Sequence, residues 1–502
     1  MLFTGLDLLH PEVTIETEGP NADAEIALTK DNGGLTLALT ADKTPVKAVR
    51  LTWKTNAAPD LLVLRDAWER GYGDLGFLPL SRRTDALPWY FLATNGKDAA
   101  ALGVMVRPRA FVSFRVTPGE ASAFVDCRAG GVGVELGGRR VDLCTFLYAE
   151  YPATDPYDAL KDFVRRMCPV SGKLPKEPVF GSNDWYYAYG DTAKESVLRD
   201  ADVQAEVTAG LPVRPFVVAD DGWQKNRCAS PWLPNGKFGD MAALAAEIRA
   251  KGAHPGLWYR PLSAPADAPE AFRLARPSEE AFLDPSHPGV REMLREDLRR
   301  FKAWGYELVK HDFSSYDLFG KWGKDMGDSP VEDGDWAFFD RSHTAAETVL
   351  SFYELLREET DGMLLLSCNA FSHLTAGLSD VQRVGDDTSG RDWERTKKMG
   401  VNSLAFRLPH NGVFYLVDSD CVGDVGNEVD PNKTAQWMDL LAYSNTALFA
   451  SFGDPTPERK ARMASAYATA NRPHTLRPVD WLNSLTPSKW LYDGKEISFS
   501  WE

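Results

Sequence analysis

A regular alternation of segments, from about Tyr157 to residue 450, constrains this sequence most strongly. Short apolar runs alternate there with amphipathic stretches of helical period, a pattern typical of βα units around a parallel sheet. We expect strands at residues 178–185, 215–219, 254–259, 307–310, 363–368, 379–384, 412–417 and 446–450. Eight parallel strands close a (β/α)8 barrel. An open, doubly wound sheet would show the same alternation, so strand number alone leaves both folds open.

Two of the intervening helices have clear boundary signals. Asp240 precedes one apolar-periodic stretch and Gly252 ends it. Ser286 precedes a longer amphipathic stretch, which Gly305 ends. A small polar N-cap and a glycine after the last turn are the usual helix start and stop signals.

The chain divides into three predicted parts of an α/β protein. Residues 1–170 contain short alternating runs, such as 34–40, 46–53 and 110–116, broken by Gly, Pro, Asn and Asp. This pattern predicts an N-terminal antiparallel β-sandwich. We assign residues 171–450 to the barrel and residues 451–502 to a short C-terminal extension, with a helix at 457–469 and a strand at 496–501.

Composition excludes several functional classes. The net charge of −16 over 502 residues argues against nucleic-acid binding, which needs clustered Lys and Arg. No stretch of about 18 apolar residues could span a membrane. No basic start followed by a long apolar run marks a signal peptide, so a cytoplasmic location is expected; a removed signal would make the protein secreted or periplasmic.

Cysteine and histidine spacing predicts no metal site and no disulfide framework. The cysteines form no CxxC pair, and the histidines form no HExxH motif. No metal and no organic cofactor is therefore expected. The cysteines are Cys127, Cys144, Cys168, Cys228, Cys368 and Cys421.

Polar and aromatic side chains follow almost every predicted barrel strand. The carboxyl ends of the strands form the active site of such barrels. A lone Asp would more simply be an N-cap or turn residue, but repetition at strand after strand weakens that interpretation. Carboxylates and cations bind sugar hydroxyls, aromatic rings cover sugar faces, and glycoside hydrolysis needs two carboxylates. The strand-end segments are 184–187, 220–224, 258–260, 310–312, 368–369, 383–387 and 418–420.

Lys310-His311-Asp312 is the sharpest of these elements. Because side chains alternate along a strand, Lys310 and Asp312 point to the same side. The lysine would lower the pKa of Asp312 and keep it ionised, as a nucleophile requires. A structural ion pair at the strand end is the alternative.

Asp386 and Asp387 are the candidates for a proton donor. A donor must keep its proton near neutral pH, which requires burial or a neighbouring carboxylate. Strand-like alternation would point these two adjacent side chains in different directions. We therefore expect one to be catalytic and the other structural.

Several motifs, taken in order, resemble the retaining α-galactosidases of glycoside hydrolase families 27 and 36. The likeness is closer to family 36, which includes compact bacterial α-galactosidases and plant raffinose-synthase-like proteins. With the first strand they span residues 178 to about 421, and the β-rich N-terminal region resembles the N-terminal sandwich of that family. The matching segments are FVVADDGWQ, GLWYRPL, LDPSHPGVREMLREDLRRFKAWGYELVKHDF, RVGDDT and VDSDC.

The resemblance implies a role for each matching residue. Asp312 corresponds to the nucleophile, and Asp387, four residues after Arg383, to the acid/base, with Asp386 as the fallback. Asp220 and Asp221 correspond to the pair that holds O4 and O6 of galactose. The other residues implied in substrate binding are Trp258, Lys310, Cys368, Asn369, Arg383, Trp185 and, reaching over from the sandwich, Trp68.

The resemblance implies retaining hydrolysis of terminal α-galactosyl residues in an oligosaccharide or glycoconjugate. It also implies a homo-oligomer. Three departures stand out: SNDWYY at the first strand, His311 inside the nucleophile motif, and a C-terminal sandwich cut to about one strand. The first two departures leave the sugar specificity undetermined. The alternatives are a raffinose-synthase-type α-galactosyltransferase, an α-N-acetylgalactosaminidase and a non-catalytic carbohydrate-binding relative.

Overall fold

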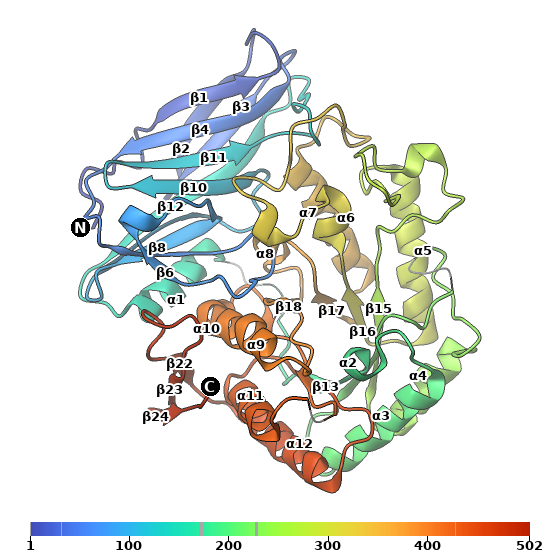
Figure 1. The fold of residues 1–502 in the computed structure, drawn as a ribbon. Helices are drawn as coiled ribbons and strands as arrows, with labels where there is room; N and C mark the ends of the chain where they lie inside the picture. Colours follow the sequence, from blue (N-terminus) through green and yellow to red (C-terminus); the bar gives the residue numbers. More distant parts are fainter. Residues whose placement is uncertain (1, 32, 170–171, 173, 226–228, 427) are drawn as a thin grey trace.

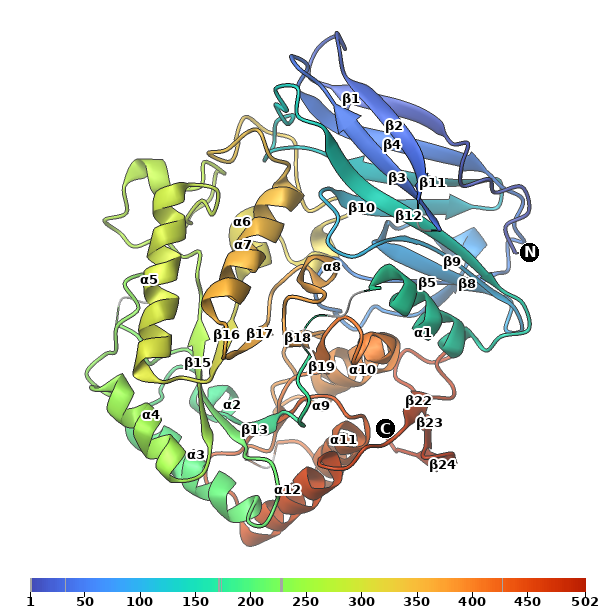
Figure 2. The ribbon, with the colours of Figure 1, turned by 180° about the vertical axis from the view of Figure 1, so that it is seen from behind.

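The computed structural model describes residues 2–31, 33–169, 172, 174–225, 229–426 and 428–502 (Figure 1). Cys228, one of the cysteines expected to form no disulfide, lies outside these residues. The other five cysteines are free and buried. From its N-terminus the chain forms two packed sheets, then a ring of parallel strands surrounded by helices, and finally a small sheet (Figures 1 and 2).

The first two sheets form the predicted antiparallel β-sandwich. Alternating side chains, such as Leu37 and Leu39 in one sheet and Val49 and Leu51 in the other, are fully buried between the sheets. One sheet has the order β1 (Glu12–Thr17), β4 (Val46–Lys54), β11 (Glu120–Asp126), β10 (Phe111–Thr117) and β7 (Leu87–Pro88). The other has the order β2 (Glu25–Asp31), β3 (Gly34–Thr40), β12 (Val141–Tyr151), β9 (Ala99–Val104), β8 (Tyr90–Thr94), β5 (Leu62–Arg65) and β6 (Phe77–Pro79).

The next sheet is entirely parallel and confirms the predicted barrel. The Ala447 N–H donates to the Val417 carbonyl at 2.8 Å, and this bond joins the two ends of the strand series into a ring. The strands, in hydrogen-bonded order, are β19 (Leu416–Asp418), β18 (Val381–Arg383), β17 (Leu364–Ser367), β16 (Leu308–His311), β15 (His254–Tyr259), β14 (Phe216–Ala219), β13 (Phe180–Asn183), β21 (Leu448–Ser451) and the short β20 (Val422–Gly423).

The strand predicted at residues 412–417 is shorter than expected. Gly412 adopts a φ of 73°, and its N–H donates to the Tyr415 carbonyl at 3.0 Å. This left-handed turn, which glycine adopts at little cost, occupies the first half of the predicted segment. The strand β19 therefore begins only at Leu416.

Helices follow the strands and cover the outside of the ring (Figures 1 and 2). The helix α12 packs against α11 and α3, as the helix that follows the last strand of the ring. The long helices are α1 (Pro156–Met167), α3 (Lys194–Val207), α4 (Met241–Ala250), α5 (Pro288–Trp304), α7 (Ala345–Glu359), α11 (Pro431–Tyr443) and α12 (Pro457–Ala470). The shorter ones are α2 (Trp185–Ala188), α6 (Ser314–Phe319), α8 (Ser372–Thr375), α9 (Trp393–Thr396) and α10 (Asn402–Arg407). None of the helices in the described part of the chain combines the length and apolar character needed to cross a membrane.

The helix boundary signals are mostly as predicted. The Asp240 carboxylate accepts from the N–H groups of Ala242 and Ala243 at 2.9 and 3.0 Å, as an N-cap does. At the next helix the N-cap is His287, whose Nδ1 accepts from the Gly289 N–H at 3.0 Å. The predicted cap, Ser286, instead donates its hydroxyl to Asp284 at 2.6 Å. A competing carboxylate two residues earlier therefore moves the cap by one residue.

The C-terminal residues after α12 form a three-stranded antiparallel sheet beside the barrel. Its strands are β22 (Leu476–Pro478), β23 (Lys489–Tyr492) and β24 (Lys495–Ser498). The last strand overlaps the segment at 496–501 where the sequence predicts one.

The sandwich and the barrel share one hydrophobic core. At their boundary the ring of Phe111 packs against the rings of Phe319 and Phe371, with centroids 5.6 and 4.9 Å apart. A buried ion pair crosses the same boundary: Arg407 Nε donates to Asp66 Oδ1 at 2.9 Å, and neither side chain is more than 1% exposed.

Arg407 also fixes the backbone of the sandwich loop that follows β5. Its Nη2 donates to the Ala67 carbonyl at 2.9 Å, and its Nη1 donates to the Glu69 carbonyl. Burial raises the pKa of Asp66, and Arg407 opposes that shift. The positive charge of the Arg407 guanidinium therefore stabilises the buried Asp66 carboxylate.

We predict that Arg407→Met lowers the free energy of unfolding by about 3–5 kcal/mol, because it leaves the Asp66 charge and two carbonyls without a partner. Urea unfolding followed by circular dichroism measures this change. Arg140 pairs with Asp142 on the sandwich surface, with side chains 55% and 61% exposed, and serves as the matched control. Arg140→Met should change the stability by less than about 0.5 kcal/mol. Equal effects of the two substitutions would contradict the importance of the buried pair.

Candidate active site

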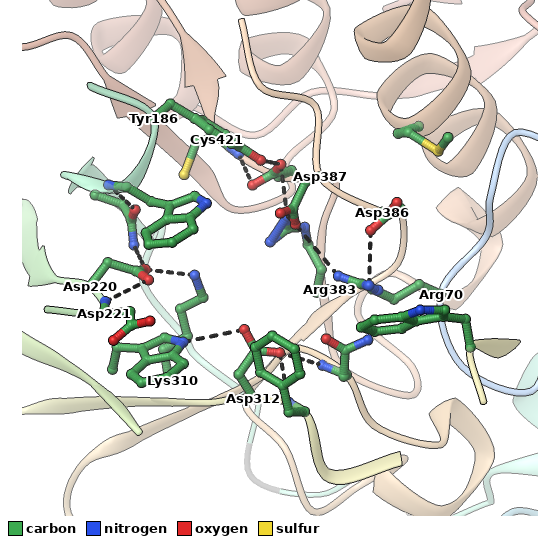
Figure 3. Close-up of a pocket in the computed structure, with 18 of the residues that line it drawn as sticks. Arg70, Tyr186, Asp220, Asp221, Lys310, Asp312, Arg383, Asp386, Asp387 and Cys421 are labelled. Carbon is green, nitrogen blue, oxygen red and sulfur yellow. Dashed lines mark hydrogen bonds and ion pairs between the residues drawn. The ribbon is translucent and has the colours of Figure 1, made fainter. Parts of the chain in front are cut away.

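A cavity of about 490 Å³ opens at the carboxyl ends of the barrel strands (Figure 3). Parallel strands all end at the same face of the ring, so residues distant in sequence meet there. Three further parts of the chain contribute: the sandwich loop after β5, the residues on either side of α6, and the segment from α9 to Met399. The lining residues are Arg70, Tyr72, Asn183, Trp185, Tyr186, Asp220, Asp221, Trp258, Lys310, Asp312, Phe313, Trp322, Lys324, Asn369, Arg383, Asp386, Asp387, Arg395, Met399, Asp420 and Cys421.

One wall of the cavity is built around Asp220, at the end of β14. Its Oδ2 accepts from Lys310 Nζ at 2.6 Å and from Asn183 Nδ2 at 2.5 Å. Its Oδ1 accepts from the Asp221 N–H at 2.9 Å, and Gln224 Nε2 donates to Asp221 Oδ1 at 2.5 Å. The two carboxylates and the lysine form a fixed set of donors and acceptors of the kind that binds sugar hydroxyls.

Asp312 lies at the base of the cavity in Figure 3, just after β16. Its Oδ1 accepts from the N–H groups of Phe313 at 2.8 Å and Asn369 at 3.3 Å. In the amide orientation that satisfies its neighbours, Asn369 Nδ2 also donates to this oxygen at 2.6 Å. Oδ2 accepts from Trp258 Nε1 at 3.3 Å. Asp312 Oδ1 is thus held by several donors, whereas Oδ2 is held by one long contact and is the freer oxygen.

Arg383 organises the opposite wall, at the end of β18. Its Nη2 lies 2.8 Å from Asp387 Oδ1 and 2.7 Å from Asp420 Oδ2. Asp420 Oδ2 also accepts from the Thr388 N–H at 2.7 Å and from the Tyr186 hydroxyl. This network fixes Asp420 as a structural acceptor, while Asp387 keeps 39% of its side chain exposed.

Asp386 has different partners from its neighbour Asp387. Its Oδ1 lies 2.9 Å from Arg70 Nη2, and its Oδ2 accepts from Arg395 Nη2 at 2.7 Å. Figure 3 shows Asp386 beside Arg70 and Asp387 beside Arg383. The two adjacent carboxyls therefore point into separate ion pairs.

The environments of Asp312 and Asp387 shift their pKa values in opposite directions. Burial raises the pKa of Asp312, but Lys310 and Arg70 oppose it and the net shift is downward. Burial raises the pKa of Asp387, with a further increase from Asp420, and this outweighs the opposing effect of Arg383 and Arg70. Asp387 therefore keeps its proton to a higher pH than Asp312 does, so the cavity holds two carboxyls of different acidity.

The structure brings together most of the site residues predicted from the sequence. Two of them lie in the described part of the chain but outside the cavity lining. Trp68 is buried in the sandwich, where its Nε1 donates to the Gly327 carbonyl at 3.0 Å and its ring packs on Trp89. Cys368 lies behind the wall, with Sγ 3.8 Å from Arg70 Nη1 and 3.7 Å from Arg383 Nη1. The expectation that Trp68 reaches over the site is thereby corrected, because the loop turns and presents Arg70 and Tyr72 instead.

His311 is also turned away from the cavity. It lies on the opposite side of β16 from Lys310 and Asp312, where its Nε2 is 3.3 Å from Ser314 Oγ and its ring packs near Tyr353 of α7. Burial lowers the pKa of His311 to about 4, so it is neutral. Its presence in the nucleophile motif therefore reflects packing against a helix and not contact with a ligand.

Several lining residues escaped the sequence prediction. Five of them had a usable signal, because they lie in a predicted strand or just after a predicted strand end: Asn183, Tyr186, Phe313, Asp420 and Cys421. Arg70 lies two residues after Trp68 in a loop that no barrel pattern could place at the site. The remaining residues lie on loops or helices whose approach depends on tertiary packing: Tyr72, Trp322, Lys324, Arg395 and Met399.

Among the described residues, no group of three or more His, Cys, Asp or Glu side chains is arranged to hold a metal ion. Four carboxylates of the cavity, Asp220, Asp386, Asp387 and Asp420, are instead paired with the cations Lys310, Arg70, Arg383 and Arg395.

No model of a protein family matches this sequence, and no curated protein sequence matches it either. Solved structures do match. TtGalA, an α-galactosidase from Thermus thermophilus solved with p-nitrophenyl α-D-galactopyranoside, is 19% identical with a TM-score of 0.63; the match covers 97% of this chain and 99% of that chain. A variant of AgaA, a GH36 α-galactosidase from Geobacillus stearothermophilus, is 15% identical with a TM-score of 0.63; the match covers 97% and 77% of the two chains.

A third solved structure has the same family designation. AgaB, a GH36 α-galactosidase from Geobacillus stearothermophilus, is 14% identical with a TM-score of 0.59, over 92% of this chain and 73% of that chain. The matches to TtGalA and AgaA each cover 97% of this chain, so they extend over the sandwich and the barrel together. The chain therefore has the fold of the α-galactosidases of glycoside hydrolase family 36.

Proposed function

We propose that this protein is a retaining glycoside hydrolase that removes terminal α-galactosyl residues. The observation that carries the proposal is the pair Asp312 and Asp387, which face one cavity with pKa values shifted in opposite directions. An ionised carboxylate opposite a protonated one is the arrangement that acid-assisted nucleophilic displacement at a glycosidic bond requires.

The reaction would proceed in two displacements. Asp312 Oδ2 attacks the anomeric carbon and forms a glycosyl ester, while Asp387 donates its proton to the departing glycosidic oxygen. Asp387, now a carboxylate, takes a proton from water, and the resulting hydroxide oxygen bonds to the anomeric carbon. The ester bond to Asp312 breaks, and Asp312 is again a carboxylate. Inversion occurs twice, so the product keeps the α configuration.

The remaining lining residues fit a sugar substrate. Asp220, Asp221 and Lys310 offer charged partners to hydroxyl groups, and Trp185 and Trp258 offer aromatic surface to the ring. Among the proteins of the same fold, TtGalA was solved with p-nitrophenyl α-D-galactopyranoside and with stachyose, and a variant of AgaA with raffinose. These ligands all carry an α-galactosyl residue, which supports an α-galactoside oligosaccharide as the partner of this chain.

We predict that the wild-type protein releases nitrophenol from an aryl α-D-galactoside and that Asp312→Ala lowers kcat by about 10³-fold or more, because no ester can form. Proton NMR of the first product should show the α anomer. Asp142→Ala, in an exposed carboxylate of the sandwich, is the matched control and should leave kcat unchanged. The β anomer as first product would exclude retention. Product analysis at a high concentration of an acceptor sugar distinguishes hydrolysis from galactosyl transfer. The same assay with an aryl α-N-acetylgalactosaminide tests whether that sugar is the substrate.

We predict that Asp387→Ala slows hydrolysis according to the leaving group. Without a proton donor, kcat/KM for an alkyl galactoside should fall by about 10²–10⁴-fold, whereas a dinitrophenyl galactoside, which leaves unprotonated, should be affected far less. Azide, which needs no general base, should restore turnover of the activated substrate as a galactosyl azide. Asp386→Ala is the paired test, and if it alone showed this pattern the proton donor would be Asp386.

We predict a bell-shaped dependence of kcat/KM on pH. Asp312 acts ionised, so activity is lost as pH falls through its lowered pKa. Asp387 acts protonated, so activity is lost as pH rises through its raised pKa. The residual activity of Asp387→Asn on the same alkyl galactoside should lose the alkaline limb and keep the acidic one. An alkaline limb that survives this substitution would assign it to another group.

A further inference from the structure

The sandwich loop that follows β5 is built into the wall of the cavity. The Gly71 N–H donates to the Val384 carbonyl at 2.8 Å, and the Asp386 N–H donates to the Gly71 carbonyl at 3.0 Å. These bonds pair Gly71 with Gly385 as a parallel bridge. On its other side Gly385 packs against the backbone at Met399: a Cβ atom would lie 2.1 Å from the Met399 carbonyl oxygen, so only glycine permits that contact. The sandwich therefore sets the position of the backbone that carries Asp386 and Asp387.

Arg70 extends from this loop to the cavity wall, where it contacts both Asp386 and Asp387. Its side chain is 5% exposed, and its Nη2 and Nη1 lie 2.9 Å from Asp386 Oδ1 and 3.5 Å from Asp387 Oδ1. Figure 3 shows Arg70 on the side of the cavity opposite Asp220, directed at Asp386. A planar guanidinium with several donors can hold more than one acceptor in a fixed geometry.

The same guanidinium also reaches Asp312 through one side chain. The Asn369 amide oxygen accepts from Arg70 Nη2 at 2.9 Å and from Nε at 3.2 Å, while its Nδ2 donates to Asp312 Oδ1 at 2.6 Å. Asn369 thereby transmits the position of Arg70 to the nucleophile oxygen that is held fixed. One residue of the sandwich thus touches the surroundings of both carboxyl groups.

We propose that Arg70 is a positioning residue of the glycosidase reaction, which orients Asp312 through Asn369 and holds the loop of Asp387 directly. This inference rests on the proposed function. It makes the sandwich a working part of the active site and not only a stabilising neighbour of the barrel. Arg407, which binds Asp66 and the carbonyls of Ala67 and Glu69, keeps the loop rigid enough for this purpose.

The positive charge of Arg70 acts on both carboxyls in the same direction. It lowers the pKa of Asp312 and the pKa of Asp387, although burial is the largest influence on each. Removing the charge should therefore raise both values. The other charged or titratable groups around the pair are Lys310, His311, Asp317 and Cys368 near Asp312, and Arg383, Asp386, Arg395, Asp420, Tyr186 and Tyr189 near Asp387. None of these changes in the variants below.

The test compares the pH dependence of kcat/KM for the wild type, Arg70→Met and Arg70→Lys. For Arg70→Met both limbs should move to higher pH, and kcat should fall by about a hundredfold as the carboxyls lose their alignment. Arg70→Lys keeps the positive charge but loses the planar guanidinium. Both limbs of the pH profile should therefore move less than in Arg70→Met, while kcat still falls. Asn369→Ala breaks only the link to Asp312 and should move the acidic limb alone.

Arg115 provides the matched control. It also extends from the sandwich to the barrel, where its Nε and Nη2 bind Asp328 at 2.8 and 2.7 Å, but it lies outside the cavity lining. Arg115→Met should leave both limbs and kcat unchanged. A loss of activity in Arg70→Met with unmoved limbs would show a purely structural role and overturn the proposal, as would unchanged kinetics.

Carboxyl carbon-13 NMR of aspartate-labelled protein keeps this test independent of turnover. Asp312→Asn and Asp387→Asn identify the two resonances, and Arg70→Met should move the titrations of both to higher pH, whatever the protein hydrolyses. If wild-type protein cleaves no α-galactoside, the proposed function fails, and the NMR titration still decides whether Arg70 governs both carboxyls. If Arg70→Met does not fold, Arg70→Lys and Asn369→Ala decide by the same titration. Titrations that stay in place would overturn the inference.

Discussion

The closure of the parallel sheet is the constraint on which the rest of the structure depends. The hydrogen bond from the Ala447 N–H to the Val417 carbonyl joins the ends of the strand series, so every strand delivers its carboxyl end to one face. That geometry brings the strand ends that precede Asp220, Asp312 and Asp387 to one cavity, although the three residues span a large part of the chain. A parallel strand cannot direct its last residues elsewhere, so substitutions at these positions change the chemistry of the site without changing where it forms.

A second constraint is the balance of charge inside the cavity. Lys310 pairs with Asp220, Arg383 with Asp387 and Asp420, and Arg70 and Arg395 with Asp386. Buried carboxylates without such partners would take up protons, because burial disfavours the charged form. The unequal division of cations leaves the pKa of Asp312 lowered and that of Asp387 raised. The same cations that stabilise the buried carboxylates therefore give the two carboxyls different pKa values, as two different roles require.

Much of the fold followed from local patterns in the sequence. Strand periodicity and helix boundary residues predicted the sandwich and eight parallel strands, because burial on one face imposes periods of two and 3.6 residues wherever a segment lies. The pattern left a closed ring and an open sheet both possible. Helix boundaries were predicted less exactly where a nearby side chain competed for the capping residue. The Ser286 hydroxyl binds Asp284, and His287 caps the helix instead. The period of two also placed Lys310 and Asp312 on one side of their strand, with His311 turned toward α7.

The sequence by itself determined the order of the elements and the candidate residues at the strand ends, since both depend on residues close together in the chain. Only the tertiary structure decided which loops approach those residues. Arg70 reaches Asp386 and Asn369 because the buried pair of Arg407 with Asp66 fixes the sandwich loop against the barrel. Trp68, two residues earlier, turns into the sandwich core. No periodicity distinguishes these two neighbours, because their directions depend on contacts with residues roughly three hundred positions away, which no local pattern records.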